Sequence, residues 1–562
     1  MRRVAMRALL VAGALCGAAA IWVWTALPAP STAAAGSPSA SDVRVAVHVH
    51  SRRSDGTGTV EVIAEAAAQA GLAAVVLTDH GDGMRAPDPP RYLAGVLVID
   101  AVEVSTWAGH YVALGAAASP YPLGGEPDAV VEDVRRLGGV GIAAHPGSTK
   151  DGLKWRDWDA PIDGLEWLNA DSEWRDRPRD LWRALATYPW RPVGTITALL
   201  NRPSFELAQW DRLTARRPVV GLAAHDAHAR LGLRGVGEPY DGAVALQVPA
   251  YAAMFAAFSN VVRLAQPLSG VATTDAMAVA RAIASGHTYA VVTGVAPSGQ
   301  VRFVAESGGS RAQMGGHLAP VGPVAVAFEA DVPADAHTTL LCDGRAVATG
   351  PGGRLSWTSA GSPGACRAEV AIGTETGRVP WLVTNPIYVR RALADVPPRA
   401  LPAPQLVLPL TGSGEVGKWT PELAAGAHGQ ASAVAGLPRR IAFAWQLGAG
   451  AGQYAALRFD PATALTGFDR LILRAASDRP MRVWLELRAP QRGGRRWGSS
   501  VYVDETPREI VVPFSALLPL DGDAARQVPL NDVTALLVVA DTVYGRPGSA
   551  GSLQFDELWL AR

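Results

Sequence analysis

Short apolar segments that each end in a histidine or a carboxylate dominate the first half of the chain. VRVAVHVH starts at Val43, LAAVVLTDH at Leu72 and VGIAAHPG at Val140, and each has the length and composition of a buried strand. Segments with the spacing of amphipathic helices lie between them, as in TVEVIAEAAAQAGL and EPDAVVEDVRRLGG. Strands that alternate with helices over residues 42–296 predict a parallel α/β barrel or sheet.

Histidines are concentrated in this region, where seven of the chain's 11 lie between residues 48 and 228. In a parallel barrel the carboxyl ends of all strands meet on one rim, so residues that end different strands converge there. His48 and His50 share one face of their strand, because side chains alternate with a period of two. The candidate metal ligands at these strand ends are His48, His50, Asp55, His80, Glu103, His110, His145, Asp226 and His228.

These nitrogen and oxygen donors predict a metal centre rather than a set of ordinary core histidines. At three or four protein ligands per metal, they suffice for two or three divalent ions that share a bridging carboxylate. No thiolate is among them, so zinc, manganese or iron are the expected metals.

The arrangement resembles the PHP (polymerase and histidinol phosphatase) superfamily over about residues 42–296. The resemblance implies a distorted (β/α)7 barrel, similar to a TIM barrel, with a trinuclear metal site. It divides the ligands among three ions: His48, His50, Glu103 and Asp226; Glu103, His110 and His145; and Asp55, His80 and His228.

Residues beside the ligands are candidates for supporting roles. The superfamily commonly has Ser or Asn where this chain has His225, so we expect His225 to line or support the site without binding metal. Asp79 is expected to act as a proton shuttle or to orient His80. Arg230 is a candidate for binding the phosphate, as is Arg52 or its neighbour Arg53, although exposed, solvated arginines are the alternative.

Two metal ions about 3.5–4 Å apart can deprotonate a bridging water and stabilise an in-line displacement at phosphorus. The chain is therefore expected to be a metal-dependent phosphoesterase acting on a phosphorylated small molecule or glycan. A nucleotidase or nuclease of the same superfamily is one alternative, and an envelope glycan-binding protein with a non-catalytic barrel is another. With 51 basic and 51 acidic residues, the chain has no charge surplus for non-specific nucleic-acid binding.

The second half of the chain has an all-β pattern. Gly-rich alternating runs over residues 297–391 predict an immunoglobulin-like β-sandwich, and a Pro-rich linker follows at 392–404. Residues 405–562 predict a jelly roll, which resembles galactose-binding-like carbohydrate-binding modules. If this part binds a glycan, Trp484 or Trp497 is the candidate contact.

Seven of the 17 tryptophans lie between the AHPG and HDAH motifs, from Trp155 to Trp210. Aromatic rims stack on sugars or bases, but packing within a helical insertion is the main alternative for most of them. Asn169, Asp171 and Trp174 follow a strand and are candidates for lining a pocket.

The N-terminus has the pattern of an export signal. Three arginines precede an apolar run over residues 8–27, and small residues follow near Ala33. Residues 1–41 are expected to be a signal peptide, or a membrane anchor with a linker, that leaves the body periplasmic or secreted. In that compartment Cys342 and Cys366 are expected to form a disulfide, with two free buried thiols as the alternative.

Overall fold

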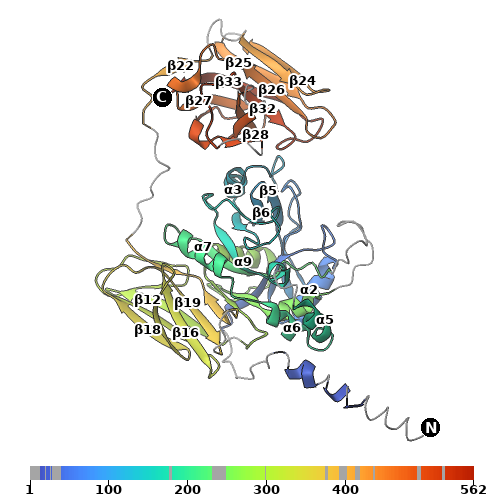
Figure 1. Cartoon of the computed structure of the whole chain (residues 1–562), viewed down its shortest axis with the longest axis vertical. Coiled ribbons are helices and arrows are strands. Elements are labelled where there is room, and N and C mark those ends of the chain that lie inside the picture. The colour runs from blue at the N-terminus through green and yellow to red at the C-terminus, as the bar shows by residue number, and fades with distance from the viewer. Residues whose placement is uncertain are drawn as a thin grey trace, which may run out of the picture. The chain divides into compact units, whose positions relative to one another are not determined.

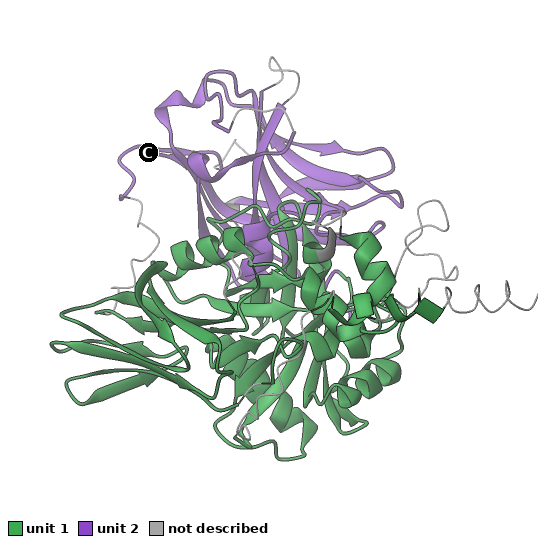
Figure 2. Cartoon of the chain, turned by 60° about the horizontal axis from the view of Figure 1, so that its bottom comes forward, with its two compact units in different colours: residues 1–81, 87–117, 134–395 green, residues 82–86, 118–133, 396–562 purple. Residues whose placement is uncertain are grey.

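The computed structural model divides the chain into two compact units, which Figure 2 shows in different colours. Unit 1 comprises residues 1–81, 87–117 and 134–395, and unit 2 comprises residues 82–86, 118–133 and 396–562. Within the described residues, no helix is both long and apolar enough to cross a membrane. The structure describes residues 13–14, 16–18, 21–25, 27, 39–175, 180–230, 248–297, 299–373, 378–391, 402–411, 418–434, 437–489, 495–521 and 526–562.

Unit 1 is a mixed α/β structure, as predicted, and its largest sheet begins with the first strand of the body. In this sheet β1 is parallel to β2 and β2 is parallel to β4, while β10 and β11 extend the other side in antiparallel order. A short strand, β3, pairs with β4 at the edge. The strands are β1 (Asp42–Val49), β2 (Ala74–Leu77), β3 (Arg91–Leu93), β4 (Val96–Asp100), β10 (Ser259–Arg263) and β11 (Thr288–Val291).

A second sheet of unit 1 has the order β5-β6-β7-β8-β9. Its β7, β8 and β9 are parallel, but β5, β6 and β7 are antiparallel, which differs from the predicted parallel alternation. Only two residues separate β5 from β6, so no crossover helix fits between them. The strands are β5 (Val102–Thr106), β6 (Gly109–Leu114), β7 (Val140–Ala143), β8 (Gly164–Asn169) and β9 (Val220–Ala224).

Backbone hydrogen bonds connect the two sheets where the predicted ligands lie. The amide of His225 donates to Val47 O at 3.0 Å, and that of Ala227 donates to His48 O at 3.2 Å. On the other side, His80 and Glu103 form a parallel bridge. The ends of β1, β2, β5 and β9 therefore meet around one region.

Helices cover these sheets along the amphipathic faces that the sequence predicts. Thr59 caps the first of them by accepting a hydrogen bond from Val62 N, and Val60 and Ile63 are among its buried residues. The helices of unit 1, labelled in part in Figure 1, are α2 (Val60–Gln69), α4 (Ala170–Arg175), α5 (Leu181–Thr187), α6 (Pro192–Leu199), α7 (Ser204–Thr214), α8 (Tyr251–Ala257) and α9 (Ala272–Ala284).

Residues 299–391 form two further layers of strands, and one of them continues the largest sheet. β20 pairs with β11, so the boundary expected after residue 296 falls inside a continuous sheet. The predicted disulfide between Cys342 and Cys366 is confirmed, and it joins directly opposite residues of β16 and β19. One layer is β12 (Val301–Ser307), β13 (Ser310–Gln313), β15 (Val324–Ala330) and β18 (Arg354–Ser359); the other is β14 (His317–Leu318), β16 (Ala336–Cys342), β17 (Arg345–Pro351), β19 (Gly364–Ile372), β20 (Leu382–Thr384) and β21 (Ile387–Val389).

Unit 2 contains two six-stranded antiparallel sheets. Trp484 and Trp497 are 2% and 1% exposed, so the prediction that one of them contacts a glycan is wrong, because neither ring can stack on a sugar. One sheet is β22 (Val407–Pro409), β24 (His428–Val434), β25 (Leu437–Gln446), β27 (Arg470–Ser477), β30 (Arg508–Pro513) and β33 (Ala550–Ala561); the other is β23 (Trp419–Leu423), β26 (Tyr454–Phe459), β28 (Met481–Ala489), β29 (Arg495–Val503), β31 (Leu518–Pro519) and β32 (Ala535–Asp541).

A segment from the first half of the sequence belongs to unit 2. Residues 118–133 include most of α3 (Pro127–Arg136) and pack against these strands. The buried guanidinium of Arg482 forms a bidentate ion pair with Asp133, with N–O distances of 2.7 and 3.0 Å. Glu126 accepts a hydrogen bond from Ser500 N at 2.6 Å.

Glu126 predicts a pH dependence for the stability of unit 2. Burial raises its pKa to about 7, since the hydrogen bond from Ser500 and the charge of Arg482 offset only part of that effect. The folded unit then holds a proton that the unfolded chain releases near pH 4.5, so the free energy of unfolding should fall by about 3 kcal/mol as pH rises through this window. Glu126→Gln keeps the acceptor for Ser500, and urea unfolding at pH 5 and 8 should show a smaller pH dependence. The remaining dependence should come from groups such as Asp541 and Glu486, whose pKa values burial also raises, and an unchanged dependence would contradict this assignment.

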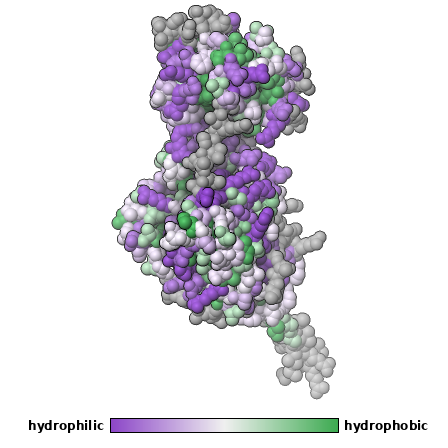
Figure 3. All heavy atoms as spheres, turned by 90° about the vertical axis from the view of Figure 1, so that its left-hand side faces the viewer, coloured by the Kyte–Doolittle hydropathy of each residue, from purple (hydrophilic) through white to green (hydrophobic). Residues whose placement is uncertain are grey.

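The face of the protein in Figure 3 mixes hydrophilic residues with smaller hydrophobic areas. Scattered apolar residues of this kind are normal on protein surfaces and indicate no particular partner.

Candidate metal centre

All nine predicted ligands converge in unit 1. In each of four overlapping groups, the ligand atoms lie within 4.8 Å of one another. The groups are His48, His50 and Asp226; His48, Glu103 and His145; His80, Glu103 and His110; and His50, Asp55, His80 and His228.

The carboxylate of Glu103 lies at the centre of these groups. Its Oε1 is 2.8 Å from His110 Nδ1 and 2.8 Å from His145 Nε2. Its Oε2 is 3.2 Å from each of three further nitrogens: His48 Nε2, His50 Nε2 and His80 Nδ1. This oxygen is buried and accepts no hydrogen bond. A buried acceptor left in this state is costly, and a cation among the same nitrogens would satisfy it.

Two aspartates complete the arrangement. Asp226 Oδ1 is 3.4 Å from the Nε2 atoms of His48 and His50. Asp55 Oδ2 lies 3.1 Å from His228 Nε2 and 3.7 Å from His80 Nε2. Each carboxylate also has a third imidazole nearby, His228 for Asp226 and His50 for Asp55, so both lie among the nitrogen donors.

The backbone is held in an unfavourable conformation at three of the predicted ligands. His48, His145 and Asp226 have positive φ angles of 62°, 30° and 46°. The pairing of β1 with β2 also shifts register between Ala46 and Val49, which is a bulge that redirects His48. Such conformations cost about 1–3 kcal/mol each and concentrate at functional sites. The strain supports a functional reading of this region.

Sequence analysis missed Glu166, the residue that holds His48 in place. His48 Nδ1 lies 2.5 Å from Glu166 Oε1, and Glu166 Oε2 accepts hydrogen bonds from His145 N at 2.7 Å and Asn169 Nδ2 at 2.8 Å. The signal in the sequence is a glutamate inside the apolar strand GLEWLN. In the structure the side chain of Glu166 is 2% exposed. A charge buried in this way needs partners.

Backbone carbonyls orient two further imidazoles, as the side chain of Glu166 orients His48. His145 Nδ1 lies 3.1 Å from Leu153 O, and His228 Nδ1 lies 2.9 Å from Asp226 O. As in His48, the Nδ1–H group donates to a fixed acceptor and leaves Nε2 facing the carboxylates. Metal-binding histidines typically have such outer partners.

Charge interactions outweigh burial at the centre. Burial raises the pKa of Glu103, but the charge of His48 and hydrogen bonds from two further imidazoles hold it well below its usual range. Burial lowers the pKa of His228, but the hydrogen bond with Asp55 and the charge of Asp226 raise it to about 9. The carboxylates are therefore ionised at neutral pH, which favours cation binding with release of the imidazole protons.

The carboxylate of Asp79 accepts three hydrogen bonds from the loop that follows His50. Its Oδ1 accepts hydrogen bonds from Ser51 N at 2.7 Å and Ser54 Oγ at 2.8 Å, and its Oδ2 accepts one from Ser51 Oγ at 2.7 Å. Asp79 therefore positions the loop that carries Asp55, and it does not contact His80 through these oxygens.

Arg52 and Arg53, which follow the His48–His50 pair, form hydrogen bonds and ion pairs with other residues of the chain. Arg53 pairs with Asp88 and with Asp100, the latter at 2.8 Å, and Arg52 Nε donates to Thr57 O at 2.7 Å. Arg230 instead lines a pocket together with Asp226 and His228. It remains the candidate phosphate contact.

His225 lies apart from the ligand groups, although it is next to Asp226 in sequence. Its ring is fully buried, stacks on Phe258 with centroids 4.2 Å apart, and lies 3.0 Å from Phe258 O through Nε2. Burial lowers its pKa to about 4, so the ring is neutral. It supports the core between β1 and β9.

The remaining tryptophan and pocket predictions have different outcomes. Three of the seven tryptophans are buried in the core: Trp155, Trp167 and Trp210. Trp182 and Trp190 are exposed. Asn169 lies among the ligand groups and Asp171 lines the pocket, whereas the side chain of Trp174 is outside the described part of the chain.

We predict that Glu166→Gln weakens metal binding by about 10–100-fold without abolishing it, because a neutral amide orients His48 less firmly. Titration of the purified protein with zinc or manganese measures this change. Glu65→Gln, on the exposed side of α2, is the matched control and should bind metal normally. Unchanged affinity in Glu166→Gln would contradict a positioning role.

Comparisons with known proteins gave matches only to solved structures: no protein-family model and no curated protein matched the chain. A two-domain protein from Bacteroides vulgatus containing a predicted PHP-like metal-dependent phosphoesterase is 13% identical, covering 64% of this chain and 99% of its own, with a TM-score of 0.27. A family 11 carbohydrate-binding module of a cellulosomal cellulase from Clostridium thermocellum is also 13% identical, covering 28% of this chain and 95% of its own, with a TM-score of 0.24. The chain is similar to each of them over the share stated.

Proposed function

We propose that the protein is a metal-dependent hydrolase of phosphate esters that uses two or three divalent ions. The observation that carries this proposal is the buried Glu103 Oε2, which accepts no hydrogen bond and lies 3.2 Å from three imidazole nitrogens. The carboxylates and imidazoles around it are the donors that zinc, manganese and iron take.

The nine predicted residues would hold the ions, with Glu103 shared between them. Bound divalent ions supply Lewis acidity, which lowers the pKa of water and stabilises charge on a phosphoryl group. The chain's own contribution is to fix the imidazoles: Glu166 holds His48, and Leu153 O holds His145. Arg230, beside His228 in the pocket, is the proposed phosphate contact.

The fold assigned to this site is the distorted seven-stranded barrel that the resemblance implies. β4 and β5 are separated by Ala101 alone and can be counted as one bent strand. The hydrogen bonds between residues 225–227 and β1 then close a ring of β1, β2, β4–β5, β6, β7, β8 and β9. We also propose that the body lies outside the cytoplasm, which the Cys342–Cys366 disulfide supports.

Metal analysis of the purified full chain followed by a substrate screen tests this function. We expect two or three equivalents of zinc, manganese or iron, and turnover of at least one class among phosphomonoesters, phosphodiesters and sugar phosphates. Preference for nucleotides would assign the protein to the nucleotidase alternative. A metal-free protein that cannot be loaded, or a loaded protein inactive on every class, would reject the proposal.

A further inference from the structure

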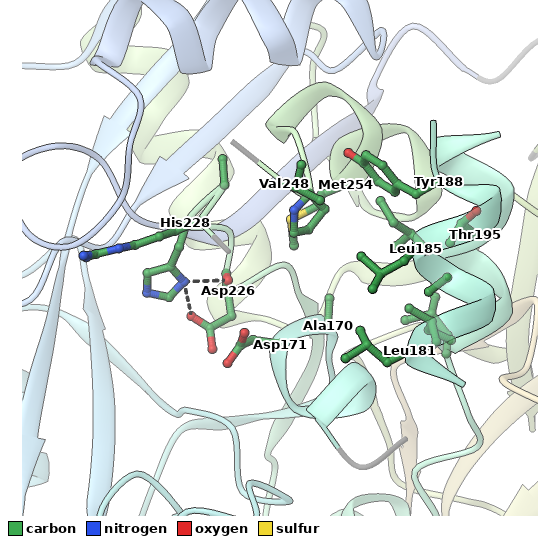
Figure 4. A pocket seen from close by; sticks show the side chains of 17 residues that line it. Ala170, Asp171, Leu181, Leu185, Tyr188, Thr195, Asp226, His228, Val248 and Met254 are labelled. Atoms are coloured by element: carbon green, nitrogen blue, oxygen red, sulfur yellow. Dashed lines mark hydrogen bonds and ion pairs between the residues drawn. The ribbon is translucent and has the colours of Figure 1, made fainter. Parts of the chain in front are cut away.

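A pocket opens directly beside the proposed metal centre. Asp226 and His228, two of the predicted ligands, form part of its wall (Figure 4). A substrate with its phosphate at the metals could therefore place a second group in this pocket.

The two ends of the pocket differ in character. Asp171 lies beside the two shared ligands at the metal end (Figure 4), whereas α5, α6 and α8 line the rest with apolar side chains. Arg230 also lines the pocket. Its apolar lining residues include Leu181, Leu185, Ile196, Leu199, Val248 and Met254.

The polar groups on the helical wall are already satisfied by the protein. Tyr188 Oη accepts a hydrogen bond from Ala250 N at 2.7 Å. Thr195 Oγ1 lies 2.8 Å from Thr187 Oγ1 and donates to Arg191 O at 2.9 Å. A ligand in this part of the pocket would gain from burying apolar surface more than from new hydrogen bonds.

Apolar surface continues from the pocket to the outside of α5. Leu181 and Leu185 line the pocket and are nevertheless 39% and 54% exposed, and Trp182 and Trp190 nearby are 65% and 75% exposed. Tryptophan is enriched at membrane–water interfaces, where one end of its ring system is apolar and the other is wet.

The apolar N-terminal run reaches the same surface. Trp22 stacks on Trp182 with ring centroids 5.9 Å apart, and Arg191 Nη1 donates to Trp24 O at 2.9 Å. Both N-terminal tryptophans are themselves partly exposed. Four tryptophans of two distant segments thus lie on or beside α5 and α6, two helices whose side chains line the pocket.

We propose that the substrate is an amphiphilic phosphate ester drawn from a lipid bilayer, with its phosphate at the metal centre and its apolar chain in this pocket. This inference rests on the proposed function for the position of the phosphate. The exposed apolar residues of α5 and the N-terminal tryptophans contact the bilayer surface.

Binding of n-alkylphosphonates to the metal-loaded full chain tests the pocket without requiring turnover. From ethyl to octyl, Kd should fall roughly fourfold per added methylene until the pocket is full. Equal Kd values along the series would overturn the pocket assignment. Because these ligands are not hydrolysed, failure of the catalytic proposal leaves this result interpretable, and hydrolysis of short esters without any chain-length dependence would reject this inference alone.

Two substitutions in α5 give a matched comparison. Ala184 lines the pocket and Ala186 is exposed outside it. Ala184→Phe should abolish the gain from longer chains, whereas Ala186→Phe should keep it; equal behaviour of the two would overturn the assignment. Should Ala184→Phe fail to fold, Leu185→Ser provides the second test: octylphosphonate should bind roughly tenfold more weakly and ethylphosphonate unchanged.

Vesicles test the source of the substrate. Trp182→Ser should reduce sedimentation with phosphatidylcholine vesicles that contain phosphatidic acid by several-fold, and leave binding of monomeric octylphosphonate unchanged. Phe205→Ser, which removes an exposed aromatic residue from α7, is the control and should bind vesicles normally. Undiminished vesicle binding by Trp182→Ser would reject the bilayer as the source.

Discussion

Glu103→Gln is expected to lose at least one metal ion per chain and to lower phosphate-ester hydrolysis on the order of a thousandfold. That loss exceeds the 10–100-fold typical of outer partners, because Glu103 would bind ions directly. Its two oxygens face five imidazoles, so the substitution removes a charge that several sites share. Glutamine keeps the shape of the side chain, and the lost charge is then the main change.

Elemental analysis of the metal content and hydrolysis of the best substrate measure the two effects separately. Glu65→Gln again serves as the control, since it removes a carboxylate from the exposed face of α2. A Glu103→Gln protein with full metal content and normal turnover would show that the central carboxylate is only a structural partner of the histidines.

Asp226→Asn and His225→Ala change neighbouring residues, and we expect them to differ in their effects on metal content and on stability. Asp226→Asn is expected to lose metal and nearly all hydrolysis, because the neutral amide is a poor ligand at a position 3.4 Å from two imidazoles. His225→Ala should keep the metal stoichiometry but lower the free energy of unfolding by about 3 kcal/mol, since it removes a buried ring that stacks on Phe258.

Urea unfolding and metal analysis on the same two preparations distinguish these outcomes. If His225→Ala loses its metal while Asp226→Asn retains it, the roles within the HDAH motif are assigned to the wrong residues.

The ligand cluster could be predicted from sequence because it depends on two regular features. Side-chain alternation predicts His48 and His50 on one face, and the meeting of strand ends predicts that the other ligands join them. The structure brings these residues together, but His48 departs from regular strand geometry with a φ of 62°. Asp79 and His80 are neighbours in an extended segment, where adjacent side chains point to opposite sides. Asp79 therefore faces Ser51 while His80 faces Glu103.

Features that depend on tertiary contacts could not be predicted in this way. Glu166 is a single acidic residue in an apolar strand, and no spacing rule connects it with His48. Trp484 was a candidate glycan contact, but both faces of β28 are buried, and Ala129 and Tyr544 belong to the same core cluster as Trp484. Residue 129 comes from a segment that the sequence assigns to the barrel.

The pairing of β20 with β11 limits where the chain can be truncated and where its gene can recombine. A gene fragment that stops at residue 296 would leave β11 as a bare strand edge, with unpaired amides and carbonyls that invite aggregation. The layers over residues 299–391 therefore cannot be exchanged or deleted as an independent cassette. Recombination that preserves the metal-binding half must carry those strands with it.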